Sequence, residues 1–143
     1  NLFVYGSMLS PDVVKAVTGD SIPESDAIVK NYSRRTLKNR DYPGVIQCEG
    51  GMVVGKVLHG VREELIALID RFEGDEYAKS IVRATLKDET ELDAFTYVWN
   101  GPSADVNDED WDFEYFRSHK LRKFLMQTRD IMNGKPLQES YDD

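Results

Sequence analysis

The chain has 143 residues, of which 41% are hydrophobic, so it can build the core of one domain without a disulfide or a structural metal. Its 26 acidic and 18 basic side chains give a net charge of -8, which disfavours nucleic acid and membrane partners. Cys48 is the only cysteine, which excludes a disulfide framework and fits a reducing, cytoplasmic compartment. The sequence begins with Asn1 rather than Met, so the presence of a targeting segment before it stays an open question.

The N-terminal segment predicts a strand followed by a short helix. Residues 2–5 form an apolar run with β propensity, which stops at Gly6-Ser7. Ser10-Pro11-Asp12 then offers an N-cap residue, a proline at the first helical position and an acid in the first turn. We therefore expect a helix that ends near Gly19.

The next stretch predicts three antiparallel strands. Apolar and polar residues alternate over 27–37, and short apolar runs follow at 44–46 and 52–58. Turn residues at 39–44 and the Glu49-Gly50-Gly51 triplet are expected to separate these strands.

The following region predicts a helix and a β-hairpin. Residues 62–72 have helical spacing, and Gly74 stands where a helix commonly ends. Residues 77–86 and 92–99 are rich in β-forming side chains, with a hairpin turn expected at 88–90.

The C-terminal part predicts a connecting loop and one long helix. The polar residues 100–110 are expected to form the loop. From Asp112 onward apolar residues recur every three or four positions, which predicts a helix that covers the sheet and ends before Gly134. The single domain would then span 1–136, with 137–143 a frayed tail.

About six strands joined by short turns indicate the α+β class, with a mostly antiparallel sheet that can curl into a barrel.

The end of the first strand is a candidate binding site. A strand that stops at Tyr5-Gly6-Ser7 and leads into a helix leaves backbone N–H groups unpaired and facing one direction. Gly6 would let a ligand approach the backbone closely. These features predict a pocket for a carboxylate or phosphate. An ordinary strand-to-helix turn is the alternative interpretation.

Glu73 is the second candidate, because it breaks the charge pattern of its helix. At 100° per residue, Glu73 falls within the apolar sector of the helix rather than on its charged face. That sector is made by Leu65, Ile66, Leu68, Ile69 and Phe72. Burial there would raise the carboxyl pKa and make Glu73 a proton acceptor near neutrality. Alternatively, the helix frays by residue 73 and the carboxylate lies in water.

Five short stretches together carry a family resemblance. They read LFVYGSM at 2–8, RDYPG at 40–44, GKVLHGV at 55–61, LIDRFEGDEY at 68–77 and TYVW at 96–99. In this order they resemble the gamma-glutamylcyclotransferase-like superfamily, most closely its plant and fungal avirulence-responsive branch. The resemblance implies a small mixed, mostly antiparallel β-barrel flanked by helices, in which the Tyr-Gly-Ser loop and an inward Glu face one cavity.

The resemblance also implies a reaction without a cofactor or a metal. Active members are transferases of the acyltransferase or lyase type that act on a small-molecule gamma-glutamyl amine. The substrate's α-amine attacks its own side-chain carbonyl, which closes 5-oxoproline and releases the attached amine. By position, Glu73 would be the general base, taking a proton from the α-ammonium and returning it to the departing nitrogen. The substrate-binding residues implied are Tyr5, Gly6, Ser7, Met8, Tyr42, Pro43 and Tyr77.

Two other functions stay open at this point. A non-catalytic binding module could use the same pocket for a carboxylate-bearing metabolite or a peptide end. A stress-response protein could act through a partner, with the aromatic side chains around Trp111 as its contact surface. Glu73 favours the enzyme, because a pure carboxylate binder gains nothing from a nearby anion.

Overall fold

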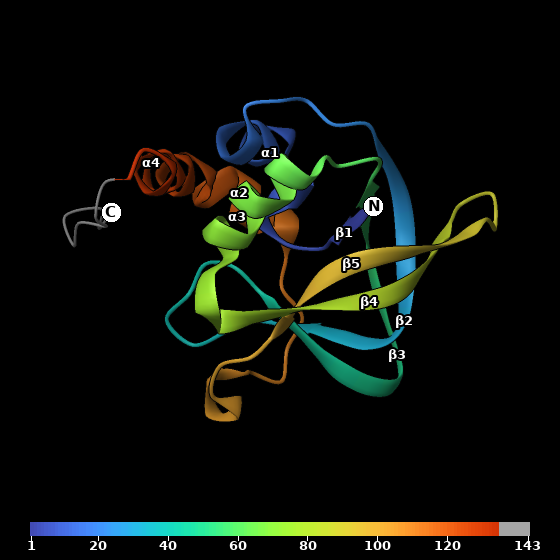
Figure 1. The fold of residues 1–143 in the computed structure, drawn as a ribbon. Helices are drawn as coiled ribbons and strands as arrows, with labels where there is room; N and C mark the ends of the chain where they lie inside the picture. Colours follow the sequence, from blue (N-terminus) through green and yellow to red (C-terminus); the bar gives the residue numbers. More distant parts are fainter. Residues whose placement is uncertain (135–143) are drawn as a thin grey trace.

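A closed five-stranded barrel is the centre of the computed structural model, which describes residues 1–134 (Figure 1). The strands are β1 (Leu2–Val4), β2 (Glu24–Arg35), β3 (Gly44–Leu58), β4 (Tyr77–Leu86) and β5 (Glu91–Trp99). Around the barrel their order is β1-β3-β2-β4-β5, and every neighbouring pair is antiparallel except the parallel pair β1 and β5. The α+β class and the mixed, mostly antiparallel barrel are therefore confirmed.

Four helices gather on one side of this barrel (Figure 1). They are α1 (Pro11–Thr18), α2 (Glu63–Glu73), α3 (Phe113–His119) and α4 (Leu121–Met132), and none of the helices within residues 1–134 is long and apolar enough to cross a membrane. Short 3-10 turns occur at Ser7–Leu9, Gly74–Glu76 and Ser103–Asp105.

The alternation of β1 divides the core into two clusters. Phe3 and Tyr5 pack with buried side chains from the other strands, such as Val29. Leu2 and Val4 instead pack with helical side chains, in a cluster that also contains Val13, Ile69 and Phe116. The first strand therefore lies between both cores, and the chain that leaves it enters the space between the barrel and the helices.

Several predicted boundaries are confirmed. The helix α1 ends at Gly19 and α2 ends at Gly74, and both glycines have positive φ angles, of 81° and 71°. Residues 87–90 join β4 to β5 and contain the expected hairpin turn at 88–90. Ser10 precedes α1 as expected, but its side chain makes no capping bond; its carbonyl oxygen accepts the first helical N–H groups instead.

One strand was wrongly divided in two by the sequence pattern. Residues 44–58 form a single strand, so the expected turn at Glu49-Gly50-Gly51 is wrong and the barrel has five strands rather than about six. Residues 48–51 of β3 lie opposite the single residue Asn31 of β2. The Oδ1 atom of Asn31 accepts the N–H of Gly50, and both residues have positive φ angles. This bulge bends the strand without ending it.

The expected long C-terminal helix is two helices. At Lys120 the backbone leaves helical geometry, with φ -122° and ψ -17°, so that α3 ends and α4 begins in a new direction. The side chain of Asp112 caps α3 by accepting the N–H groups of Glu114 and Tyr115. The helix α4 packs mainly against the other three helices rather than across the sheet. The predicted tail at 137–143 lies outside the described residues.

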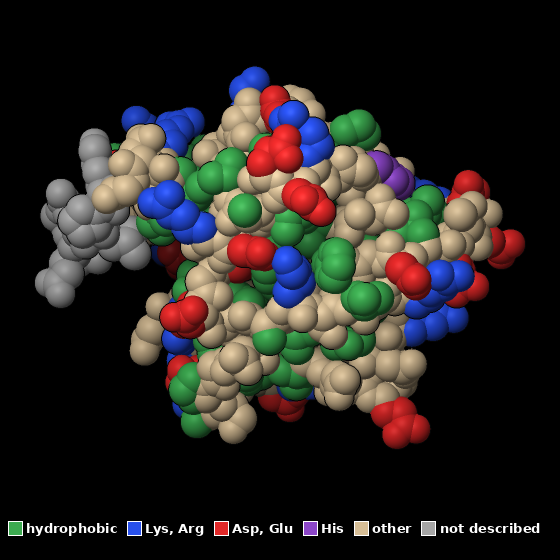
Figure 2. Space-filling model, in the orientation of Figure 1, with side chains coloured by type: hydrophobic (Ala, Val, Ile, Leu, Met, Phe, Trp, Pro, Cys, Tyr) green, Lys and Arg blue, Asp and Glu red, His purple; other side chains and the backbone are tan. Residues whose placement is uncertain are grey.

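Ion pairs connect the surface elements. Acidic and basic side chains are interspersed over the face shown in Figure 2, and pairs such as Lys79 with Asp70 join α2 to β4. The loop at 100–110 is held by arginines of the strand β2 and of the segment after it; Arg34, for example, pairs with Asp110 at 2.8 Å. Exposed pairs of this kind each contribute little to stability, so the two apolar clusters carry the fold.

Candidate active site

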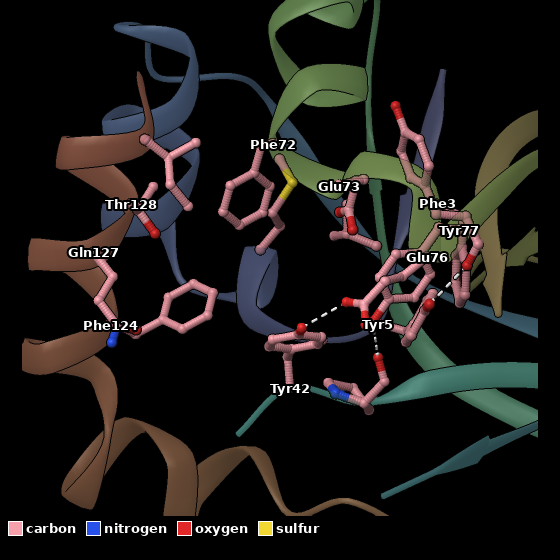
Figure 3. Close-up of a pocket in the computed structure, with 16 residues that line it drawn as sticks. Phe3, Tyr5, Tyr42, Phe72, Glu73, Glu76, Tyr77, Phe124, Gln127 and Thr128 are labelled. Carbon is pink, nitrogen blue, oxygen red and sulfur yellow. Dashed lines mark hydrogen bonds between the residues drawn. The ribbon is translucent and has the colours of Figure 1, made fainter. Parts of the chain in front are cut away.

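A cavity of about 270 Å3 lies between the end of β1, α2 and α4 (Figure 3). Sixteen residues line it. They come from β1 and the turn after it, from the segment at 42–43, from the end of α2 and the turn that follows it, from the first residue of β4, from β5 and from α4. Two of them, Glu73 and Glu76, carry an ionisable acid, whereas the rest are mainly aromatic or aliphatic. A largely apolar cavity with a few polar groups is typical of a small-molecule site.

The turn after β1 reaches this cavity and carries backbone amides without a backbone acceptor. Within residues 1–134 the N–H groups of Gly6, Ser7 and Met8 donate no backbone hydrogen bond. They lie past the last ladder pair and before the first bond of the 3-10 turn, in which Leu9 N donates to Gly6 O at 3.0 Å. Gly6 and Met8 line the cavity, whereas Ser7, between them, is buried and is not among the lining residues.

Gly6 is required here by its contact with Pro43. A Cβ atom at position 6 would lie 2.9 Å from both Cγ and Cδ of the proline ring, closer than real contacts allow. The sequence predicts that the glycine makes room for a ligand, and the structure shows that it makes room for Pro43, another residue of the cavity lining. The turn after β1 and the segment at 42–43 are therefore packed against each other.

Glu73 is the last residue of α2 and faces the cavity, so the helix does not fray before it (Figure 3). Burial raises the pKa of the Glu73 carboxyl from 4.5 to about 8, and the negative charge of Asp70 adds to this shift. Neither a cation nor a hydrogen-bond donor within residues 1–134 offsets it. Glu73 is thus a carboxyl group that can hold or release a proton near neutral pH.

Glu76, one turn further along the chain, is in a different state. Its Oε1 atom accepts the hydroxyl of Tyr42 at 2.7 Å, and its Oε2 atom accepts Nε of Arg40 at 2.8 Å. Arg40 also lies over the ring of Trp99, 5.0 Å from the centroid. The negative charge of Glu76 is therefore balanced, whereas that of Glu73 would not be.

Buried tyrosines complete the wall and are fixed by hydrogen bonds to backbone carbonyls. Tyr5 donates to Tyr97 O and Tyr77 donates to Pro43 O, both at 2.6 Å. Burial raises the pKa of Tyr5, Tyr77 and Tyr97 well above the usual tyrosine value. These side chains therefore stay neutral and rigid around the carboxyl group.

The structure brings most of the residues implied by the resemblance into one place. Six of the seven implied substrate-binding residues line the cavity with Glu73, and Ser7 is the exception. Sequence reasoning missed the contribution of α4, from which Phe124, Gln127, Thr128 and Ile131 face the cavity. Phe124, Thr128 and Ile131 recur at intervals of four and three positions, which marks one helical face, but this spacing does not show what that face covers.

The aromatic side chains around Trp111 do not line the cavity. Of the aromatic side chains around Trp111, Tyr115 is 55% exposed, whereas Trp111 itself is only 7% exposed and donates its Nε1–H to Asp41 O at 2.7 Å. Trp111 therefore packs inside the molecule. Within residues 1–134, no three His, Cys, Asp or Glu side chains lie together as a metal site.

Comparison with known proteins identifies the family. A family model described as gamma-glutamyl cyclotransferase, AIG2-like, matches residues 2–113. The chain belongs to this family. Among curated relatives from Arabidopsis thaliana, AIG2-like protein C is 35% identical over 98% of this chain and 82% of its own length. AIG2-like protein A is 36% identical over 100% of this chain and 88% of its own length.

Solved structures agree with the AIG2-like assignment. A solution structure of an Arabidopsis thaliana protein is 33% identical, with a TM-score of 0.69 over 96% of this chain and 93% of that one. A structure titled gamma-glutamyl cyclotransferase is 16% identical, with a TM-score of 0.56 over 95% of this chain and 80% of that one. This second likeness extends the shared fold to more distant relatives. The family supports a gamma-glutamyl cyclotransferase-like role for the AIG2-like chain.

Proposed function

We propose that this protein is a cyclotransferase that releases 5-oxoproline from a gamma-glutamyl amine, with Glu73 as its general base and acid. The proposal is carried by one observation: an uncompensated carboxyl group lines the same cavity as Gly6 and Met8, in a turn whose amides have no backbone acceptor within residues 1–134. The reaction needs both: donors that hold an anionic substrate end, and a group that moves protons near neutral pH.

The glutamyl end of the substrate binds at the turn after β1. Its carboxylate accepts hydrogen bonds from the amides of Gly6, Ser7 and Met8, which have no protein acceptor within residues 1–134. Tyr42, Pro43 and Tyr77 contribute the wall beside it, together with Tyr5. These contacts orient the glutamyl group as the reaction requires, because the α-amine must lie against the side-chain carbonyl of the same molecule.

The chemical step is an intramolecular acyl transfer. The α-ammonium first gives a proton to the ionised Glu73, and the resulting amine attacks the side-chain carbonyl carbon to form a carbon–nitrogen bond. The bond between that carbon and the attached amine then breaks, and Glu73 returns the proton to the departing nitrogen. The second proton of the attacking nitrogen is lost to solvent, and the released amine takes up a second proton from solvent. Overall the α-nitrogen loses two protons and the released amine, which leaves as an ammonium ion, gains two.

The cavity can perform this step with few groups because the nucleophile and the carbonyl belong to one molecule. Holding that molecule folded converts the attack into an oriented unimolecular step, which supplies much of the rate gain. A carboxyl pKa of about 8 suits the same group for taking up and returning a proton. No further nucleophile is needed from the protein.

The experiment that tests the proposal is an assay of 5-oxoproline release from a panel of gamma-glutamyl amines. The panel contains gamma-glutamyl amino acids, gamma-glutamyl-ε-lysine, glutathione and gamma-glutamyl alkylamides. Release from at least one member, dependent on protein concentration, is expected. Binding of the compounds without any release would instead identify a carboxylate-binding module, and the enzymatic proposal would be wrong.

A further inference from the structure

We propose that the amine part of the substrate carries an uncharged, apolar substituent that lies against α4. This inference rests on the proposed function for the position of the glutamyl part and concerns the other part of the substrate. The cavity has two chemically different sides. Figure 3 shows Glu73 and Tyr5 on one side and Phe124, Gln127 and Thr128 of α4 on the other. With the glutamyl part at Glu73, the amine part extends toward α4.

The α4 side is built from one face of the helix. Phe124, Thr128 and Ile131 follow one another at intervals of four and three positions, and Gln127 adjoins Thr128, so the four residues lie next to one another along α4. The ring of Phe124 packs edge-on against Phe72 of α2, with centroids 6.0 Å apart. The two polar members of this face carry no charge. The surface presented to the amine part is therefore uncharged, and it combines an aromatic ring and an aliphatic side chain with one amide and one hydroxyl.

The charges of the lining argue against a carboxylate on the amine part. No Lys, Arg or His is among the described residues that line the cavity. The acids are Glu73, which needs its charge for the reaction, and Glu76, which already binds Arg40 and Tyr42. A second carboxylate would meet like charge without a cation to pair with, and burying it there is costly.

An ammonium group is the competing occupant, because aromatic rings attract cations. However, on the α4 side it would lose its hydration against Phe72, Phe124 and Ile131, and the nearby acid Glu76 is already paired. An alkyl or aromatic end loses no strong hydration and gains from burial. The neutral apolar amine is therefore the occupant that this wall favours.

The position of this wall in the chain fits the same inference. The turn after β1 and Glu73 lie inside the stretch 2–113 that matches the family model, whereas α4 lies beyond it. The groups proposed for the shared reaction thus belong to the matched part of the chain. The groups proposed to select the leaving amine come from the helix outside it.

Three substrates of matched length test the inference. Each carries a gamma-glutamyl group on a four-carbon chain, which ends in a methyl group (pentylamine), a carboxylate (5-aminopentanoate) or an ammonium (1,4-diaminobutane). We expect kcat/KM for the pentylamide to exceed both others by at least about tenfold. An equal or higher value for either charged compound would overturn the inference while leaving the proposed function intact.

Binding separates this inference from the proposed reaction. Calorimetric titration of the Glu73→Gln variant with the same compounds needs no turnover, and the pentylamide is expected to bind most tightly. That ranking would support the inference even if no compound released 5-oxoproline, which is the failure of the proposed function. A different ranking, or no binding of any compound, would overturn the inference.

A pair of lysine substitutions on α4 gives an independent test. Gln127→Lys adds a cation on the cavity side, so kcat/KM for the 5-aminopentanoate compound is expected to rise about tenfold relative to the pentylamide. Met126→Lys adds the same charge at a side chain that is 49% exposed and does not line the cavity, and it should leave the ranking unchanged. Equal effects of the two variants would contradict the placement of the amine part.

Discussion

Asp70 lies one helical turn before Glu73 on α2, and its negative charge raises the pKa of the Glu73 carboxyl beyond the effect of burial alone. The carboxylate of Asp70 is itself fixed by Lys79, whose Nζ lies 3.1 Å from Oδ2, and by the hydroxyl of Tyr97, which donates to Oδ1. Tyr97 lines the cavity. An exposed acid and the buried site are thus connected through named contacts.

Replacing Asp70 by Asn should shift the pH dependence of catalysis. Glu73 accepts a proton only when ionised, so kcat/KM is expected to rise with pH through its pKa of about 8. Removing the neighbouring negative charge favours the ionised form, so this rise should move to lower pH. The amide oxygen can still accept the Tyr97 hydroxyl, which keeps the geometry. Profiles of kcat/KM between pH 6 and about 9.5 measure the shift.

The matched control is Asp93→Asn, which removes an exposed carboxylate that pairs with Arg83 on the β4–β5 hairpin and lies outside the cavity lining. It changes the net charge by the same amount, so it should leave the profile in place. A shift of equal size in both variants would indicate a general charge effect and contradict the specific role of Asp70.

Folding stability should depend on pH through Glu73. Its folded pKa is raised from 4.5 to about 8, so between these values the folded state binds more protons than the unfolded state. The contribution of Glu73 to folding stability is therefore fully present below about pH 4.5. It decreases as the pH rises above that value and is lost once the pH has passed about 8. Glu73→Gln, which stays neutral, should gain about 2 kcal/mol over wild type between pH 5 and 8, less than full linkage because the cavity opens to solvent.

Urea unfolding at several pH values measures this difference, with Glu63→Gln on the exposed side of α2 as the control. The free energy of unfolding of the Glu63 variant is expected to differ from that of wild type by the same amount at every pH. A constant offset for Glu73→Gln as well would mean that burial does not shift the Glu73 carboxyl, contrary to our account.

Gly6→Ala should destabilise the protein by about 1–3 kcal/mol, because the new methyl group would collide with the ring of Pro43. Pro43→Ala removes the colliding atoms, so the double variant should recover part of that loss. Free energies of unfolding for the four members of this cycle give the coupling directly. Additive effects would show that the two segments do not constrain each other.

Arg40→Met should weaken the cavity wall. The substitution leaves Glu76 with one hydrogen-bond partner, Tyr42, and removes the ion pair with Asp105 in the loop at 100–110. We expect a loss of roughly 1–2 kcal/mol in stability and a higher KM, because a carboxylate without its cation would then face the substrate. Arg83→Met, which breaks an exposed pair, should change neither by a measurable amount. Equal losses in both variants would contradict this role for Arg40.

The local elements were predictable where turn chemistry and side-chain periodicity agree. Gly19 and Gly74 end their helices, and the turn at 88–90 closes its hairpin, because each follows a rule that involves only neighbouring residues. Glu73 could be predicted to point inward for the same reason: its direction follows from the apolar face of its own helix.

The errors arose where a distant segment decides the local structure. Gly50 resembles a turn residue, yet pairing with β2 continues on both sides of it and Asn31 accepts its N–H. The break at Lys120 lets α4 pack on the other helices, and periodicity alone does not contain that information. Phe124 and Gln127 reach the cavity only through this packing, so their place in the site required the structure.

The role of Glu73 as the general base is tested most directly by the rate at which Glu73→Gln releases 5-oxoproline from the best gamma-glutamyl substrate found. Gln preserves the size of the side chain but cannot accept the α-ammonium proton, so kcat should fall by about a hundredfold or more. Far-UV circular dichroism should be unchanged, and Glu63→Gln on the same helix should keep full activity. Undiminished release by Glu73→Gln would contradict its assignment as the general base.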